Sequence, residues 1–380
     1  MKKTNLSGGQ SFGKRLQQFV RDNAVPIMFV LICAYCIPQA GFSWSYLLNE
    51  VMTRLGRNAF LILSLLIPVM AGMGMNFGMT LGAMAGEIGL IFAADWQVWG
   101  IPGMILAAIV SIPISVGLGV MIGKILNRSK GREMITSYMI SFTMNGVYQF
   151  VVLFMMGPII PIIHDSLKLP RGYGIRNTVS LLSMRQSLDN LLAIQVGGVK
   201  IPVLTLLIIS LACLFIVWFR KTKLGQDMRA VGQDMDVARD AGINVERTRV
   251  ISMVISTVFA GFGMIIYLQN VGNFPTYTAH SQIGMFSIAA LLVGGASVDK
   301  AGIGNVFLGV ILFHTMFIVA PKTGAAITGD SMIGEYFRVF VSYAVITLAL
   351  VMYESKKRMN KSLAGQQLAA GQAAEEEASK

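Results

Sequence analysis

Polar side chains interrupt several long apolar stretches of this chain, and these are the residues that could carry chemistry. A polar or ionisable group costs free energy inside a membrane-spanning segment, so each one is a functional candidate by default. For the amides, hydrogen bonds between neighbouring helices are the simpler explanation. The candidates are Asn76, Glu87, Asn145, Gln149, Gln269, Asn270, Asn305 and His314.

Glu87 and His314 are titratable members of this set, and a proton relay is one interpretation of them. Neither has a paired acid or base within its own apolar stretch. Glu87 stands between Gly82, Gly86 and Gly89, a spacing that lets helices approach closely. We therefore expect Glu87 to lie at a packed helix contact and not in a relay.

Two familiar ligand-binding motifs are incomplete in this sequence. Cys33 and Cys36 form a CxxC pair, but no second pair or nearby histidine completes a metal site, so we expect apolar packing for these cysteines and for Cys213. The stretch around Gly123 and Lys124 has the wrong glycine spacing for a phosphate-binding loop and lacks its hydroxyl residue. The sequence thus predicts neither a metal nor bound ATP in this chain.

The composition indicates that membrane spans carry these residues. The chain has 380 residues, 54% of them hydrophobic and only 13% charged. A net charge of +12 would suggest nucleic acid in a soluble protein, but here Lys and Arg flank apolar runs, as the positive-inside rule predicts. We therefore expect no nucleic-acid partner and no cleavable signal peptide. Both termini are expected in the cytoplasm, because basic groups precede the first run and follow the last: Lys2, Lys3, Lys14 and Arg15, then Lys356, Lys357, Arg358 and Lys361.

The fold class expected from this pattern is an all-α polytopic membrane protein with about ten transmembrane helices. A span takes roughly 20 apolar residues. The membrane domain covers 24–354, after a cytoplasmic segment 1–23 and before a cytoplasmic, disordered tail 355–380 that is poor in bulky apolar residues. The expected spans are 24–38, 58–72, 78–94, 102–126, 134–157, 201–219, 250–268, 284–298, 302–320 and 336–353.

A charged segment, 220–249, separates two of these spans. Its excess of Arg and Lys places it in the cytoplasm. It is longer than a simple hairpin needs, and it has a helical pattern of its own. We expect a soluble partner to dock there.

A second connection, 158–200, lies outside in this topology although it is basic. It carries Lys168, Arg171, Arg176, Arg185 and Lys200 against Asp165 and Asp189. Long translocated loops follow the charge rule weakly, so the topology stands. Two interpretations stay open: a solvated loop, and a basic surface that faces an acidic partner.

Three stretches resemble one family of transport proteins. LGQDMRAVGQDMDVARDAGINV (224–245) resembles the cytoplasmic coupling loop of permease subunits of bacterial ATP-binding-cassette importers, in the ribose, galactose and branched-chain amino acid class. FSIAALLVGGASVDKAGIGNVFLGVILF (286–313) is similar to the alanine-rich span and glycine pair of that family. GMNFGMTLGAMAG (74–86) departs from it, with Asn76, Phe77 and Gly78 in the places of aspartate, leucine and serine and Thr80 in that of a glycine.

The resemblance implies a coupling helix and a set of partners. It implies two permease subunits of the same or homologous sequence, two cytoplasmic ATPase subunits that bind ATP and Mg, an external solute-binding protein and the lipid of a bacterial inner membrane. The chain itself would be a transport subunit and not an enzyme. Arg229 would contact the ATPase, or alternatively lipid or solvent, and Gly225 and Gly242 would bound helices. The implied coupling residues are Gly225, Arg229, Ala230, Gly232, Ala238, Gly242, Ile243 and Asn244.

The resemblance implies a small neutral solute, a monosaccharide first and a nucleoside second, because relatives of this class carry both. The loss of a carboxylate at Asn76 changes a polar element in or near the pathway and leaves the choice of solute open. Amides and an aromatic face suit a neutral polyhydroxyl solute better than fixed charges do. The expected pathway residues are Asn76, Phe77, Asn145, Gln149 and Asn270. The residues expected to receive the binding protein are Lys168, Arg171, Arg176 and Arg185.

Two other classes of membrane protein remain as alternatives. An ion-coupled secondary carrier would need a titratable or ion-binding cluster within the membrane and often an internal repeat. A membrane enzyme would need a constellation of carboxylate, His or Cys side chains. Neither is clear in the sequence.

Overall fold

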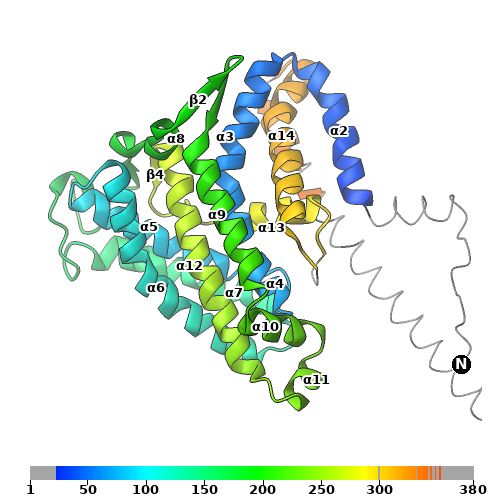
Figure 1. The fold of residues 1–380 in the computed structure, drawn as a ribbon. Coiled ribbons are helices and arrows are strands. Elements are labelled where there is room, and N and C mark those ends of the chain that lie inside the picture. Colours follow the sequence, from blue (N-terminus) through cyan, green and yellow to red (C-terminus); the bar gives the residue numbers. More distant parts are fainter. Residues whose placement is uncertain are drawn as a thin grey trace, which may run out of the picture.

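The computed structural model describes residues 23–297, 300–330, 332–340, 343–344, 347 and 351. The expected tail 355–380, the expected segment 1–23 apart from Asn23, and much of the expected span 336–353 lie outside these residues. The described part is mostly helical and contains two small sheets (Figure 1).

Three helices pack together at the centre of the bundle: α5 (Met79–Asp95), α6 (Gly100–Arg128) and α12 (Val245–Val271). Glycines on α5 set their spacing. A Cβ on Gly82 would lie 2.1 Å from the carbonyl oxygen of Thr257, and one on Gly89 would lie 2.3 Å from that of Ala107. Small residues allow this approach of membrane helices. The close packing expected around Glu87 is confirmed.

A second group of helices lies beside the first: α2 (Ala24–Ala40), α3 (Trp44–Leu63), α13 (Ile283–Val293) and α14 (Ile303–Thr328). Figure 1 shows α2 in blue next to α14 in orange. The hydroxyl of Ser43 caps α3 by accepting a hydrogen bond from the Tyr46 N–H at 3.3 Å. The helix therefore begins well before the expected span 58–72, and it continues past a short break as α4 (Leu66–Met70). The expected boundary was wrong, and the correction brings Arg54 and Arg57 inside a span.

The flank of the bundle carries α7 (Glu133–Phe150), a π-helical turn (Val151–Met155) and α9 (Val203–Phe219). The outer side of α7 is apolar and uncovered. The Phe142 side chain is 74% exposed, and Tyr138, Val147 and Phe150 are exposed beside it.

The two ends of the bundle differ in structure (Figure 1). At one end the charged segment forms α10 (Lys223–Gln233) and α11 (Met235–Asp240), so its expected helical pattern is present. The other end holds the connection 158–200, which folds into a layer with strands. This layer corrects the all-α expectation. It contains η2 (Asp165–Leu167), β1 (Thr178–Ser180) paired antiparallel with β4 (Asn273–Pro275), η3 (Leu182–Met184), α8 (Ser187–Leu191), and the hairpin of β2 (Ala193–Val196) and β3 (Val199–Pro202).

Among the described residues, five helical stretches are long and apolar enough to cross a membrane, and the count is six if the bent pair α9 and α10 forms one span. α2 and α13 are apolar but shorter. The chain is therefore a polytopic helical membrane protein, while ten crossings stay a prediction. The five stretches are Trp44–Met70, Gly100–Arg128, Glu133–Met155, Val245–Val271 and Ile303–Thr328.

Candidate functional site

A cavity of about 180 Å³, called here the α7 cavity, lies between α5, α7 and the segment before α13. Phe77 and Tyr138 meet edge to face at one side, with ring centroids 5.0 Å apart. The remaining lining combines polar side chains with Phe142 and Met285. Its lining residues are Phe77, Thr80, Tyr138, Ser141, Phe142, Asn145, His280, Ser281 and Met285.

Three side chains from different elements form a hydrogen-bonded chain at this cavity. His280 Nδ1 lies 2.9 Å from Glu87 Oε2, and His280 Nε2 lies 2.9 Å from Asn145 Oδ1. Both ring nitrogens thus lie at hydrogen-bond distance from oxygen atoms of other side chains. Glu87 and His280 are almost fully buried. The carboxylate holds the imidazole, and the imidazole orients the amide that lines the cavity.

These hydrogen bonds give Glu87 an ionisable partner that its own span does not contain, as the sequence predicted for the span itself. Its partner comes from the connection before α13, not from its own span. His280 was not among the candidates, because it follows a Pro- and Thr-containing connection and the sequence carries no periodic signal that would place it inside the bundle. Neighbouring residues fix the arrangement further. The Tyr148 ring packs edge-on against His280, and its hydroxyl donates to the Thr276 carbonyl at 3.0 Å.

The expected pathway residues separate into two places. Phe77 and Asn145 line the α7 cavity, and Gln149 Nε2 donates to Asn145 Oδ1 at 3.2 Å. Asn76 is fully buried just behind Phe77, where its Oδ1 accepts the Gly78 N–H at 2.7 Å.

Asn270 lies elsewhere, at a buried carboxylate. Its Nδ2 donates to Asp189 Oδ2 at 2.6 Å, and Gln269 and Thr205 also donate to that carboxylate. Asp189 belongs to α8, so this cluster ties the layer formed by 158–200 to α12 and α9. The structure does not bring Asn270 to the cavity that Phe77 and Asn145 share.

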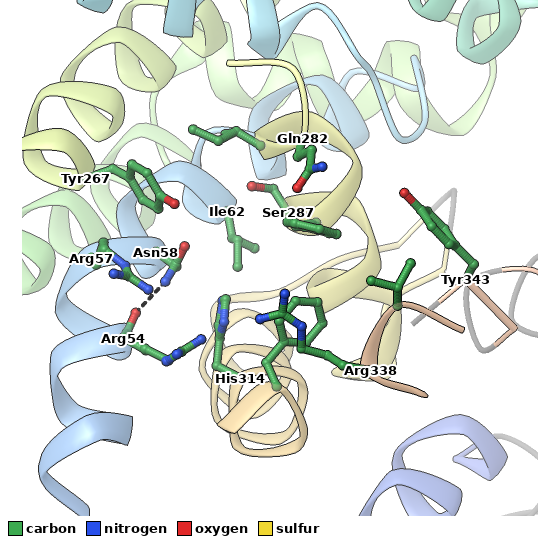
Figure 2. Close-up of a pocket in the computed structure, with 14 residues that line it drawn as sticks. Arg54, Arg57, Asn58, Ile62, Tyr267, Gln282, Ser287, His314, Arg338 and Tyr343 are labelled. Carbon is green, nitrogen blue, oxygen red and sulfur yellow. Dashed lines mark hydrogen bonds between the residues drawn. The ribbon is translucent and has the colours of Figure 1, made fainter. Parts of the chain in front are cut away.

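The other polar candidates have structural surroundings of their own. Asn305 accepts the Gly302 N–H at 3.0 Å and donates to the Gly294 carbonyl at 2.8 Å, as expected for an interhelical hydrogen bond. His314 lies in a different cavity, between α3, α13 and α14 (Figure 2). Cys33 and Cys36 are buried free thiols, and the described residues contain no cluster of three metal-binding side chains.

Several of the implied coupling residues pack inward. A Cβ on Gly225 would lie 2.1 Å from the Phe219 carbonyl oxygen, and one on Gly232 would lie 2.3 Å from that of Met70. Ala238 is buried in a small core with Val231, Val245 and Ile243, against which Ala230 also packs. These residues hold α10 and α11 against the ends of α9 and α4.

The remaining residues of the charged segment face outward or end its helices. Arg229 is exposed, and Val237 on α11 is an apolar side chain with 65% exposure. Gly242 has φ +83° and ends the α11 turn in a conformation that favours glycine. Asn244 begins α12, where its Oδ1 accepts the Arg247 N–H at 3.0 Å. Gly242 therefore lies just past the end of α11, as expected of a helix-bounding residue. The same expectation for Gly225 was wrong, because Gly225 lies inside α10, which Thr222 caps.

A buried ion pair joins this segment to α7. Arg249 Nη2 lies 2.6 Å from Glu133 Oε1, and the Arg249 side chain is fully buried. Arg249 Nη1 also lies 3.5 Å from the sulfur of Met235, the first residue of α11. The starts of α7, α11 and α12 therefore meet at one guanidinium.

The basic residues of the layer formed by 158–200 are mostly exposed. Lys168 pairs with Asp165 at 2.8 Å, and this hydrogen bond and charge lower the pKa of Asp165. Arg176 Nε donates to the Lys168 carbonyl at 3.0 Å, and Arg171 is exposed nearby. The stem of Arg185 packs against Gly272. Only part of this basic charge is free to meet a partner.

The chain matches, over residues 46–350, the family described as branched-chain amino acid transport system / permease component. It is 25% identical over 314 residues to the nucleoside ABC transporter permease protein NupB of Lactococcus lactis subsp. cremoris, covering 80% of this chain and 79% of that relative.

Two relatives from Haemophilus influenzae match over shorter stretches. The xylose transport system permease protein XylH is 29% identical over 42% of this chain and 40% of its own length, and the galactose/methyl galactoside import permease protein MglC is 28% identical over 44% and 48%. No solved structure matches the chain. With a helical segment at one end of a membrane bundle and a family match over most of its length, the chain belongs to the permease components of the branched-chain amino acid transport system family.

Proposed function

We propose that this permease moves a small neutral solute past the α7 cavity, driven by ATP hydrolysis on a separate partner chain. The observation that carries the proposal is the lining of that cavity, where an amide and an imidazole face two aromatic rings. Ligand sites of this kind combine apolar walls with a few placed polar groups. Phe77, Asn145 and Gln149 are its proposed pathway residues, with His280 added to them.

The uncovered side of α7 supports a second permease subunit. An apolar face of this size on a membrane helix is covered either by lipid or by another helix, and the cavity opens beside it. A second copy or a homologous chain would close the cavity from that side. Tyr138 and Phe142 would then lie between the two subunits.

Nucleosides and monosaccharides are both candidate solutes, and two observations favour a nucleoside. The relative that covers four fifths of the chain is a nucleoside permease, whereas the matches to sugar permeases cover less than half of it. The cavity also offers aromatic rings beside a polar edge, which suits a planar base joined to a sugar. Ribose would use the polar edge alone.

Uptake into reconstituted vesicles tests this assignment. The permease would be combined with its ATPase and binding protein, and entry of labelled uridine and of labelled ribose would be followed with and without ATP. We expect uridine entry to depend on ATP, and we expect unlabelled ribose to compete with uridine only weakly. Entry that follows an ion gradient without ATP would favour the secondary carrier instead.

The α10–α11 segment is the proposed docking site of the ATPase. Arg229 and Val237 are its exposed contacts, while Gly225 and Gly232 fix its position against the bundle.

A displacement of α11 would be transmitted to α7 through the ion pair of Arg249 and Glu133. Removing one partner of a buried ion pair leaves an uncompensated charge and costs about 3–5 kcal/mol. A Glu133→Gln variant, which keeps the shape, should hydrolyse ATP but transport poorly.

Reversal of Arg229 and a bulky replacement of Gly242 test the docking site itself. We expect each to uncouple ATP hydrolysis from transport while the permease still inserts. The control is Arg128→Glu, an exposed arginine at the end of α6. If transport is unchanged in both test variants, the ATPase docks elsewhere.

The external layer is the proposed site for the solute-binding protein. Arg171, Arg176 and Arg185 are its exposed basic residues, and Lys168 contributes less because it is half-buried and paired with Asp165. Charges of this kind speed and orient an encounter more than they add affinity.

A further inference from the structure

Several positive charges gather inside the bundle in a second cavity, called here the arginine cavity. It has a volume of about 360 Å³ and lies between α3, α13, α14 and the helical residues 332–340. Arg54, Arg57 and Arg338 line it together with His314, and none of its described lining residues is acidic. Figure 2 shows these side chains converging from opposite walls.

The depth of these arginines makes their presence costly. Arg54 and Arg57 lie within the candidate span Trp44–Met70, and His314 lies in the middle of Ile303–Thr328. Charged side chains at such depth are rare, and they pair with each other or mark a pathway or ligand.

Two of the three arginines have carboxylate partners. Arg54 Nε lies 3.0 Å from Glu50, and Arg338 Nη2 lies 2.6 Å from Glu335. Arg57 differs. Within the described part of the chain no carboxylate lies at ion-pairing distance from it, and its guanidinium instead lies 5.1 Å from the centroid of the Tyr267 ring. Three guanidinium charges against two carboxylates leave one positive charge in excess.

Asp189 is a further carboxylate that attracts Arg57 through space, but it does not cancel this charge locally. It accepts hydrogen bonds from Thr205, Gln269 and Asn270 and makes no ion pair with Arg57. These donors satisfy its oxygens, and Asp189 does not line the arginine cavity.

Two buried nitrogens at this cavity also lack hydrogen-bond partners. One is Nε of Arg57, and the other is Nδ1 of His314, whose side chain is only 7% exposed. Buried polar atoms are usually paired, and each exception calls for an explanation such as a missing ligand. The two atoms belong to opposite walls, α3 and α14. A single group bound between the walls would give both nitrogens a hydrogen-bond partner.

We propose that the arginine cavity binds an anionic group with carboxylate or phosphate oxygens, held by Arg57 and His314. A guanidinium presents its donors in a planar fork that matches such oxygens. The volume is ample for a small oxyanion or for the head of an acidic phospholipid that enters between helices. The two sources share this chemistry. The site is separate from the α7 cavity, so it does not depend on the proposed solute pathway.

The binding test uses the purified full chain in a neutral detergent. Its thermal unfolding midpoint would be followed as inorganic phosphate replaces chloride at constant ionic strength. In a parallel arm, retention of phosphatidylglycerol and of phosphatidylcholine would be measured by native mass spectrometry. A midpoint that rises with phosphate indicates a soluble anion, whereas selective retention of phosphatidylglycerol indicates a lipid source.

Variants locate the response within the cavity. Arg57→Gln removes the excess charge, and we expect it to weaken the response to either ligand at least tenfold. His314→Asn should weaken it less, and Arg57→Lys should retain part of it, which also covers the case in which Arg57→Gln fails to fold. Arg128→Gln, which removes an exposed arginine, should respond like the wild type. The proposal is overturned if neither ligand has an effect, or if the response of Arg57→Lys, His314→Asn and Arg128→Gln equals that of the wild type.

Discussion

The α7 cavity and the arginine cavity lie in one helical bundle, but they differ in whether their buried ionisable side chains have partners. In the α7 cavity, Glu87 Oε2 lies 2.9 Å from His280 Nδ1, so each ionisable side chain has the other as its partner. In the arginine cavity, Arg57 has no such partner among the described residues. A compensated pair can orient neighbouring amides without attracting ions. An excess charge invites an anion, so the first cavity suits a neutral solute and the second suits a charged group.

The largest effect is expected when the compensation in the α7 cavity is broken. Glu87→Ala leaves His280 buried without its carboxylate, which should lower the free energy of unfolding by about 3–5 kcal/mol and abolish most uptake. Chemical unfolding of the purified protein and ATP-driven uptake would measure both. Glu87→Gln keeps a hydrogen bond to the ring and should lose less. If Glu87→Ala unfolds at the same denaturant concentration as the wild type, the Glu87–His280 pair does not stabilise this cavity.

A moderate effect is expected when a polar group that faces the solute is removed. Asn145→Ala should weaken the apparent affinity of uptake about tenfold, which corresponds to about 1.4 kcal/mol and to a typical lost hydrogen bond. Asn305→Ala on α14 is the matched control, because it removes an amide whose hydrogen bonds are all within the bundle. The control should change stability and not affinity. Equal losses of affinity in the two variants would argue against solute contact at Asn145.

A smaller and more selective difference is expected in the accessibility of the two cavities. A cysteine at Ser141, in the α7 cavity, should react with a water-soluble thiol reagent at a rate that changes severalfold with the nucleotide state of the ATPase. A cysteine at Ser287, in the arginine cavity, should react at the same rate in both states. Labelling rates would be compared with ATP and with a non-hydrolysable analogue. The reverse pattern would place the solute pathway in the arginine cavity.

The smallest effect is expected outside both cavities, at the external layer. Reversing Arg171 and Arg176 together should slow association with the binding protein a few-fold and flatten its dependence on salt, because exposed charges are screened beyond about 8 Å at physiological ionic strength. Stopped-flow association at several salt concentrations would measure this. The Arg128→Glu variant at the other end should associate normally. An unchanged rate and salt slope would leave this layer as a solvated surface.

Much of the molecule was predictable from local sequence. Apolar runs and their basic flanks predicted a polytopic helical protein, and the motif around Gly225 and Gly242 indicated the family and a helical segment between two spans. Glycine spacing around Glu87 predicted close packing. These features depend on residues near each other in the chain, where hydropathy, helix caps and glycine conformations act directly.

The sites themselves depended on tertiary structure. Glu87 and His280 are 193 positions apart, and Glu133 and Arg249 are 116 apart, so no local pattern links either pair. The expected span began at residue 58 and so left out Arg54 and Arg57. The packing of α3 against α13 and α14 places these two arginines inside the bundle. Composition determines that a segment enters the membrane, because burial of apolar surface acts on every residue of the segment. Which buried charges find partners is decided by helix packing, because the partners come from distant parts of the chain.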